Sequence, residues 1–218
     1  MGRINLLLTT SNGNLANKKE MIENAVKAAE EYVFPKLDID WDIDLLVTNR
    51  LYNMIIPEDG VGGYTHASDF IECAIDEEKA TANFISEILA HELCHAARWG
   101  KNDEWISSLF DGIINEGIAT YFEAEFVKNR EEKQFFIKTI LKRQDKENEK
   151  ILENLRDKLN SNSYDYSTLF FYGDDNLPRW SAYSLGSYLV KKYLEKTKKT
   201  IKEAFIDKYS DFRSILLT

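Results

Sequence analysis

Residues 88–97 read ILAHELCHAA, and this stretch is the strongest structural signal in the chain. It contains His91 and His95, two of only three histidines in 218 residues. Positions i and i+4 of an α-helix lie about 40° apart around its axis, so both imidazoles can point at one metal ion. Glu92 is rotated about 100° from His91, which still allows it to reach a water molecule on the metal. The pattern H-E-x-x-H therefore predicts two zinc ligands and a general base on one helix.

A hydrolytic zinc site needs a third protein ligand and keeps one position for water. The segment NEGIATYFE at residues 115–123 offers Glu116, which lies beside the apolar face of a helix predicted over residues 112–128. A lone buried charge there would be costly without a partner, and a metal ion is such a partner. The alternative is that His91 and His95 are buried histidines satisfied by Glu116 alone.

Three segments together resemble a known family: H-E-x-x-H at residues 91–95, N-E-G-x-A at residues 115–119, and YSLGSY at residues 183–188. They are similar to the gluzincins, which have the thermolysin-like ligand set, and to a domain-of-unknown-function group described as predicted zinc-dependent proteases. The resemblance covers about residues 60–199. It implies a zincin-like fold, Zn²⁺ bound by His91, His95 and Glu116, and Glu92 as the catalytic base.

The resemblance also implies two further parts of a peptidase site. Gluzincins carry a tyrosine or histidine that polarises the substrate oxygen, and Tyr183 is the residue that matches, with Tyr188 as a competing candidate and a core aromatic role as the alternative. They also pair an extended peptide with the edge strand that precedes the metal helix. Gly63, Tyr64 and Thr65 are the substrate-binding residues that this places, with the backbone along Phe70 to Ile75 as the alternative, although the glycines there also suit a simple turn.

One position departs from the thermolysin pattern, which has an acidic residue four positions after the ligand glutamate. Thr120 stands there in this chain. Asn115 and Thr120 are therefore the candidates for supporting the ligands through hydrogen bonds. Cys94 is predicted to be a core residue, because a fourth protein ligand would close the position needed by water. His66 is predicted to be a partly exposed strand residue.

The pattern along the chain predicts an α+β fold: a small N-terminal mixed sheet with an edge strand packed on the H-E-x-x-H helix, then a mainly helical C-terminal part. We expect a single metallopeptidase-like domain over residues 1–218, with an α/β sub-lobe at 1–80 and a helical sub-lobe at 81–218 that carries the metal ligands. Strands are predicted at 4–10, 38–48, 64–66 and 70–76. Helices are predicted at 17–34, ended by Pro35, at 82–99, capped by Gly100, and at 112–128, 180–197 and 200–217. An exposed or interrupted helix is predicted at 131–160 and a loop at 161–179.

Composition limits the partners. A net charge of −9 argues against nucleic acid, because phosphate binding requires a basic surface. No apolar stretch approaches the ~20 residues that cross a bilayer, and the N-terminal apolar run is too short for a signal peptide. Two cysteines are too few for a disulfide framework, which favours a reducing compartment. We expect a cytoplasmic monomer that acts on a peptide or protein substrate.

Three functions remain open from the sequence. The first is a zinc metallopeptidase, with an endopeptidase or oligopeptidase favoured because the chain lacks the G-x-M-x-N segment of related aminopeptidases. The second is a non-catalytic zinc-binding regulator that binds a protein partner. The third is hydrolysis of a non-peptide amide. Glu92 favours an enzyme, since a scaffold has no use for a base.

Overall fold

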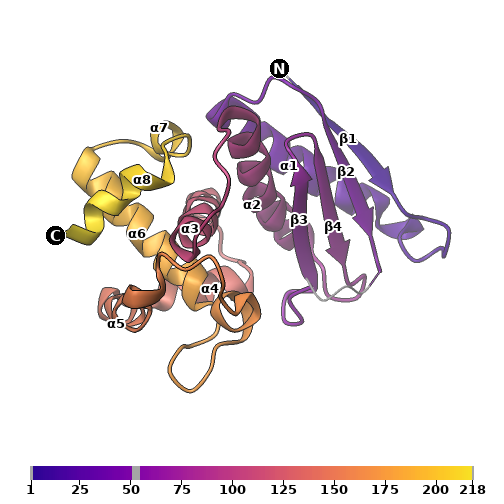
Figure 1. The fold of residues 1–218 in the computed structure, drawn as a ribbon. Helices are drawn as coiled ribbons and strands as arrows, with labels where there is room; N and C mark the ends of the chain where they lie inside the picture. The colour runs from indigo at the N-terminus through magenta and orange to yellow at the C-terminus, as the bar shows by residue number, and fades with distance from the viewer. Residues whose placement is uncertain (1, 51–54, 218) are drawn as a thin grey trace. The chain divides into compact units, whose positions relative to one another are not determined.

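A computed structural model describes residues 2–50 and 55–217 of the chain (Figure 1). It is an α+β structure with one mixed sheet and a mostly helical remainder, as predicted. The chain divides into two compact units. The first comprises Met1–Lys101 and Glu125–Ile137, and the second comprises Asn102–Ala124 and Lys138–Thr218.

The sheet of the first unit contains β1 (Ile4–Leu8), β2 (Ile43–Thr48), β3 (Val61–Ala67) and β4 (Phe70–Ile75), in the order β1-β2-β4-β3. Strands β1, β2 and β4 are parallel to one another, and β3 pairs antiparallel with β4. Because β3 comes last in the order, it is an edge strand. Alternate β4 residues Ile71, Cys73 and Ile75 are fully buried. The predicted hairpin before the metal helix is confirmed.

Two helices cover one face of this sheet (Figure 1). The first, α1 (Lys19–Leu37), continues through Pro35, so the prediction that proline ends it was wrong. A proline so near the end of a helix removes only one hydrogen bond, and buried Phe34 and Leu37 favour continuation. Asp38 then ends the helix in a left-handed conformation, and its N–H donates to the carbonyl of Phe34.

The second helix, α2 (Ala82–Lys101), carries the H-E-x-x-H segment and packs on β3 and β4. Gly100 lies inside α2, so its predicted role as a cap was wrong. A Cβ atom at Gly100 would lie 2.6 Å from the ring of Trp41. The glycine therefore serves a close approach between α2 and the residue that precedes β2.

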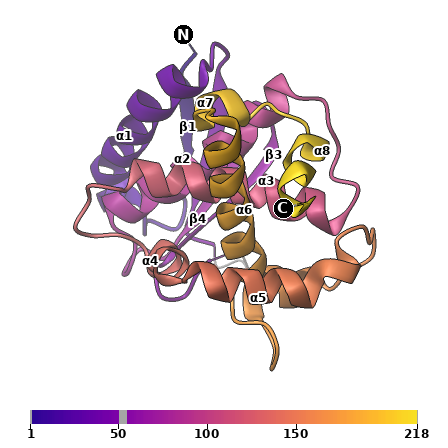
Figure 2. The ribbon, with the colours of Figure 1, turned by 90° about the vertical axis from the view of Figure 1, so that its left-hand side faces the viewer.

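The second unit is helical (Figure 2). Its elements are most of α3 (Leu109–Phe126) and α4 (Phe135–Lys142), then α5 (Asp145–Leu155), α6 (Ser181–Thr197), α7 (Ile201–Ala204), α8 (Tyr209–Phe212) and a 3₁₀ turn at Arg213–Leu217. The predicted interruption in residues 131–160 is confirmed, because α5 begins at a capping box in which the Gln144 N–H donates to Glu147, 2.7 Å away. The last predicted helix is instead broken into short turns.

The predicted loop at 161–179 contains a π-helix at Ser167–Tyr172. Its i to i−5 bonding is seen where the N–H of Gly173 donates to the carbonyl of Thr168 at 2.9 Å. None of the helices within residues 2–50 and 55–217 has the length and hydropathy needed to cross a membrane.

Candidate metal centre

The two histidines of α2 converge as the sequence predicts. The Nε2 atoms of His91 and His95 lie 3.1 Å apart, and the ring of His91 is buried. Two nitrogen ligands of a tetrahedral zinc ion, each at its usual bond length, are about 3.3 Å apart. The spacing of the two imidazoles therefore fits a zinc ion held between them.

The first unit fixes the surroundings of His91 with two buried carboxylates. Asp59 accepts hydrogen bonds from the backbone N–H groups of Phe135 and Phe136, at 2.5 and 3.1 Å, and Glu87 accepts one from Gln134 at 2.8 Å. Phe136 in turn packs edge-on against the ring of His91, with centroids 6.5 Å apart. These contacts hold the apolar ring of Phe136 beside His91, which is one of the candidate ligands.

Glu92 lies against the edge strand. Its side chain is 6% exposed, and the hydroxyl of Thr65 lies 2.8 Å from Glu92 Oε2 and 2.9 Å from the Glu92 backbone carbonyl. At Gly63 an added Cβ would lie 2.4 Å from Glu92 Cγ, so the backbone of β3 touches the glutamate directly. Gly63 and Thr65, predicted to bind substrate, thus contact the candidate base. Tyr64 is 56% exposed, and its substrate role stays a prediction.

Glu116 lies on α3 in the second unit and is half-buried. Its neighbour Gly117 packs on Gly186 of α6, since a Cβ on Gly117 would lie 2.3 Å from the carbonyl carbon of Gly186. A Cβ on Gly186 would lie 2.1 Å from the carbonyl oxygen of Ile113. The N-E-G-x-A and YSLGSY segments therefore meet through their glycines, which explains why both motifs contain one.

A family model described as predicted Zn-dependent protease (DUF2268) matches residues 19–214. The chain belongs to this family. The membership supports a metal-dependent protease in general, and no curated protein matches the chain. The match extends beyond residues 60–199, where the sequence resemblance lies, to α1, β2 and α8.

In this family member the predicted catalytic Tyr183 lies near the start of α6, half-buried. Its ring packs edge-on against Phe170 of the π-helix, with centroids 5.6 Å apart. Tyr188 instead donates its hydroxyl to Glu149 at 3.1 Å. Burial and this hydrogen bond raise the pKa of Tyr188 to about 12. Its hydroxyl is thus engaged at a different place within the second unit.

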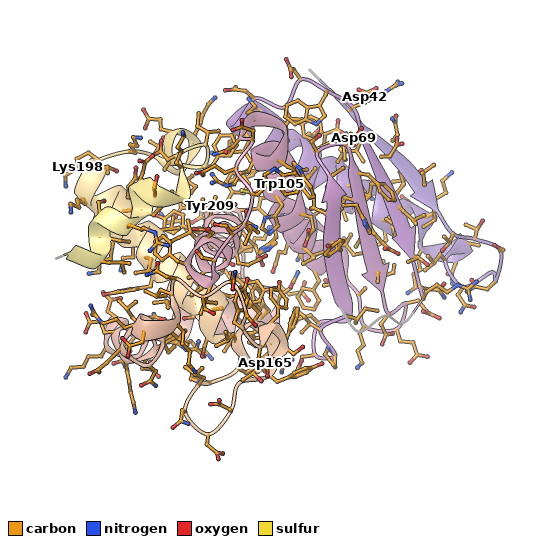
Figure 3. All side chains as sticks on the ribbon, in the orientation of Figure 1. Asp42, Asp69, Trp105, Asp165, Lys198 and Tyr209 are labelled. Carbon is orange, nitrogen blue, oxygen red and sulfur yellow. The ribbon has the colours of Figure 1, made fainter. Side chains whose placement is uncertain are left out.

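Asn115 and Thr120, predicted to support the ligands, both lie on α3. Asn115 accepts a hydrogen bond at 3.1 Å from the hydroxyl of Tyr209, which is labelled in Figure 3. Thr120 is fully buried, and in residues 2–50 and 55–217 its hydroxyl has no hydrogen-bond partner. Their role toward the ligands stays a prediction.

Tyr164 is a further residue of interest that the sequence motifs do not indicate. Its pKa is raised by burial first, and then by the negative charges of Asp111 and Glu116, so its phenol lies within electrostatic reach of a candidate ligand. A Cβ at Gly112 would lie 3.1 Å from the Tyr164 hydroxyl. No motif in the sequence distinguishes Tyr164 from the other aromatic residues of the segment 161–179.

Proposed function

We propose that the protein is a zinc metallopeptidase in which His91, His95 and Glu116 hold the metal ion and Glu92 is the general base. The donor atoms of these three side chains are of the kind that could hold a metal ion. Two imidazoles and one carboxylate are the ligand set of hydrolytic zinc sites that leave a position for water. The observation that carries the proposal is the 3.1 Å convergence of the two Nε2 atoms, with Glu92 buried on the same helix.

A zinc ion held by these three residues would be a Lewis acid, able to polarise a carbonyl group and to lower the pKa of water. Glu92 takes a proton from the attacking water through Oε1, which accepts no hydrogen bond from the residues described. The same carboxyl then returns this proton to the amine nitrogen as the carbon–nitrogen bond breaks. Tyr183 donates a hydrogen bond to the oxygen of the substrate carbonyl, where negative charge develops.

The substrate class that we favour is an internal peptide bond, cleaved by an endopeptidase or oligopeptidase. The absence of a G-x-M-x-N segment from the sequence supports this choice over an aminopeptidase. The edge strand β3 supports it too, because the part of its edge beyond the bridge between Val61 and Ile56 can pair with an extended peptide through backbone hydrogen bonds.

The test combines zinc content with cleavage of a broad peptide library. Wild-type protein should bind about one zinc per chain, and His95→Ala should lose it. His66→Ala is the matched control, because His66 is a half-exposed histidine of β3 that contacts Glu72 at 3.3 Å. Its zinc content should equal that of wild type.

Glu92→Gln separates an enzyme from a zinc-binding regulator. The variant keeps the volume of the side chain but removes the base, so hydrolysis should fall by about 10²- to 10⁴-fold while zinc stays bound. Cleavage by this variant at the wild-type rate would exclude Glu92 as the base. If zinc-loaded wild type cleaves no peptide, the peptidase proposal is wrong, and a regulator or a hydrolase of a non-peptide amide remains.

A further inference from the structure

Thr65 contacts Glu92 in an unusual way, because its one hydroxyl reaches two oxygens of the same residue. These are the backbone carbonyl oxygen at 2.9 Å and Oε2 at 2.8 Å. The hydroxyl therefore fixes the direction of the carboxylate relative to α2, and it does so from a position that is 8% exposed.

Gly63 completes the contact from the same strand face, two residues away. An added Cβ would lie 2.4 Å from Glu92 Cγ and 2.9 Å from both Cδ and Oε1. The side chain of Glu92 thus contacts the backbone of β3 at Gly63, and only a residue without a Cβ atom leaves room for it. Any side chain at position 63 would occupy the place of the glutamate.

The strand that carries these two residues is itself fixed. Gly63 pairs with Cys73 and Thr65 with Ile71 on β4, and the register shifts only beyond Thr65. Bulges of this kind occur beside active sites, where they re-aim side chains. The negative charge of Glu92 also contributes to the raised pKa of buried Cys73, the β4 residue that pairs with Gly63.

We infer that Thr65 is a positioning residue, whose hydroxyl holds Oε2 of Glu92 so that Oε1 faces the reacting water, with Gly63 providing the space. This inference rests on the proposed role of Glu92 as the base. In this inference the side chain of Thr65 bonds to Glu92, and the backbone groups of β3 bind the substrate.

Thr65→Val is the main test, because valine keeps the branched shape of threonine in a strand and removes only the hydroxyl. A mispositioned catalytic group typically costs about 10- to 100-fold, so kcat should fall by that factor. KM should stay within about twofold, since the substrate contact is not made by this side chain. Zinc content should be unchanged. Thr65→Ser restores the hydroxyl and should recover most of the lost kcat.

Thr48→Val is the matched control. Thr48 is a buried threonine of the same sheet, 2% exposed, and its hydroxyl accepts hydrogen bonds from the hydroxyl of Thr9 at 3.1 Å and from the N–H of Arg50 at 3.3 Å. The variant loses these hydrogen bonds away from Glu92, so it reports the general cost of removing a buried hydroxyl. Its kcat should equal that of wild type.

Crystal structures of wild type, Thr65→Val and Thr65→Ser give a reading that does not need activity. Wild type and Thr65→Ser should each show one Glu92 conformer bonded to residue 65, and Thr65→Val a displaced or divided carboxylate. An unmoved Glu92 in Thr65→Val would overturn the inference, as would an unchanged kcat where wild type is active. An inactive wild type would instead overturn the peptidase proposal, and the conformers of Glu92 would still decide the role of Thr65.

Discussion

Glu92 on α2 and Glu116 on α3 are both acidic residues of the proposed site, but different kinds of contact fix the backbone or side chain at each position. On α2 the glutamate is fixed by a hydroxyl from a neighbouring strand. On α3 the residue after the glutamate is fixed by backbone contact with α6, where neither Gly117 nor Gly186 has room for a methyl group. Loss of a polar anchor should therefore damage chemistry, whereas loss of a glycine contact should damage folding.

The largest effect on activity is expected from loss of the Tyr183 hydroxyl. Tyr183→Phe should lower kcat by about 10²- to 10³-fold, as removal of a hydrogen-bond donor to a developing oxyanion does, with little change in unfolding free energy. Tyr188→Phe is the control, because its hydroxyl is bonded to Glu149. Steady-state kinetics with a cleaved library peptide provide the measurement. Equal rates for the two variants would exclude the hydroxyl of Tyr183 from catalysis.

A smaller effect is expected from the glycine contact. Gly117→Ala should lower the unfolding free energy by about 2–3 kcal/mol, because α3 and α6 must separate to admit the methyl group. Gly112→Ala, on the same helix, meets the Tyr164 hydroxyl at 3.1 Å and gains helix propensity, so its stability should change little. Urea unfolding of the two variants measures the difference. If Gly117→Ala is as stable as wild type, the contrast between the two helices is wrong.

The smallest effect concerns Cys73, which is buried in the sheet next to Glu92. Burial first, and then the charges of Glu92 and Glu72, raise its pKa from 9.0 to about 12. The folded state thus favours the neutral thiol, so its contribution to stability is complete below pH 9 and is lost as the pH rises toward 12. Wild type should lose up to about 1.4 kcal/mol per pH unit above 9 relative to Cys73→Ala. A constant stability difference between the two proteins from pH 8 to pH 10.5 would show that the thiol is not shielded.

The sequence was sufficient for the fold class and for the paired histidines, because both depend on local periodicity. Hydrophobic spacing located α2, and the same spacing placed His91 and His95 on one side of it. The predictions at Pro35 and Gly100 were wrong because both depend on tertiary packing. Burial of Phe34 and Leu37 favours continuation of α1 beyond the proline, and the ring of Trp41 leaves no room for a side chain at Gly100.

The site beyond the histidines was only partly predictable. Gly63 and Thr65 were predicted to bind substrate because of a family resemblance. Their contacts with Glu92 depend on how β3 packs on α2, and the sequence of neither segment alone indicates this packing. Tyr164 lies in a stretch with no motif, and its coupling to Glu116 arises from the fold of the second unit. The predicted single domain with a sub-lobe boundary at residue 80 stays a prediction.

The most direct test of the central claim is X-ray absorption at the zinc edge on protein loaded with one equivalent of zinc. The spectrum should fit two imidazole nitrogens and a carboxylate oxygen at about 2.0–2.2 Å, together with a light-atom ligand from solvent. No sulfur is expected near 2.3 Å, because Cys94 belongs to the buried core of α2. A sulfur ligand, or a spectrum that fits fewer than two imidazoles, would contradict the central claim.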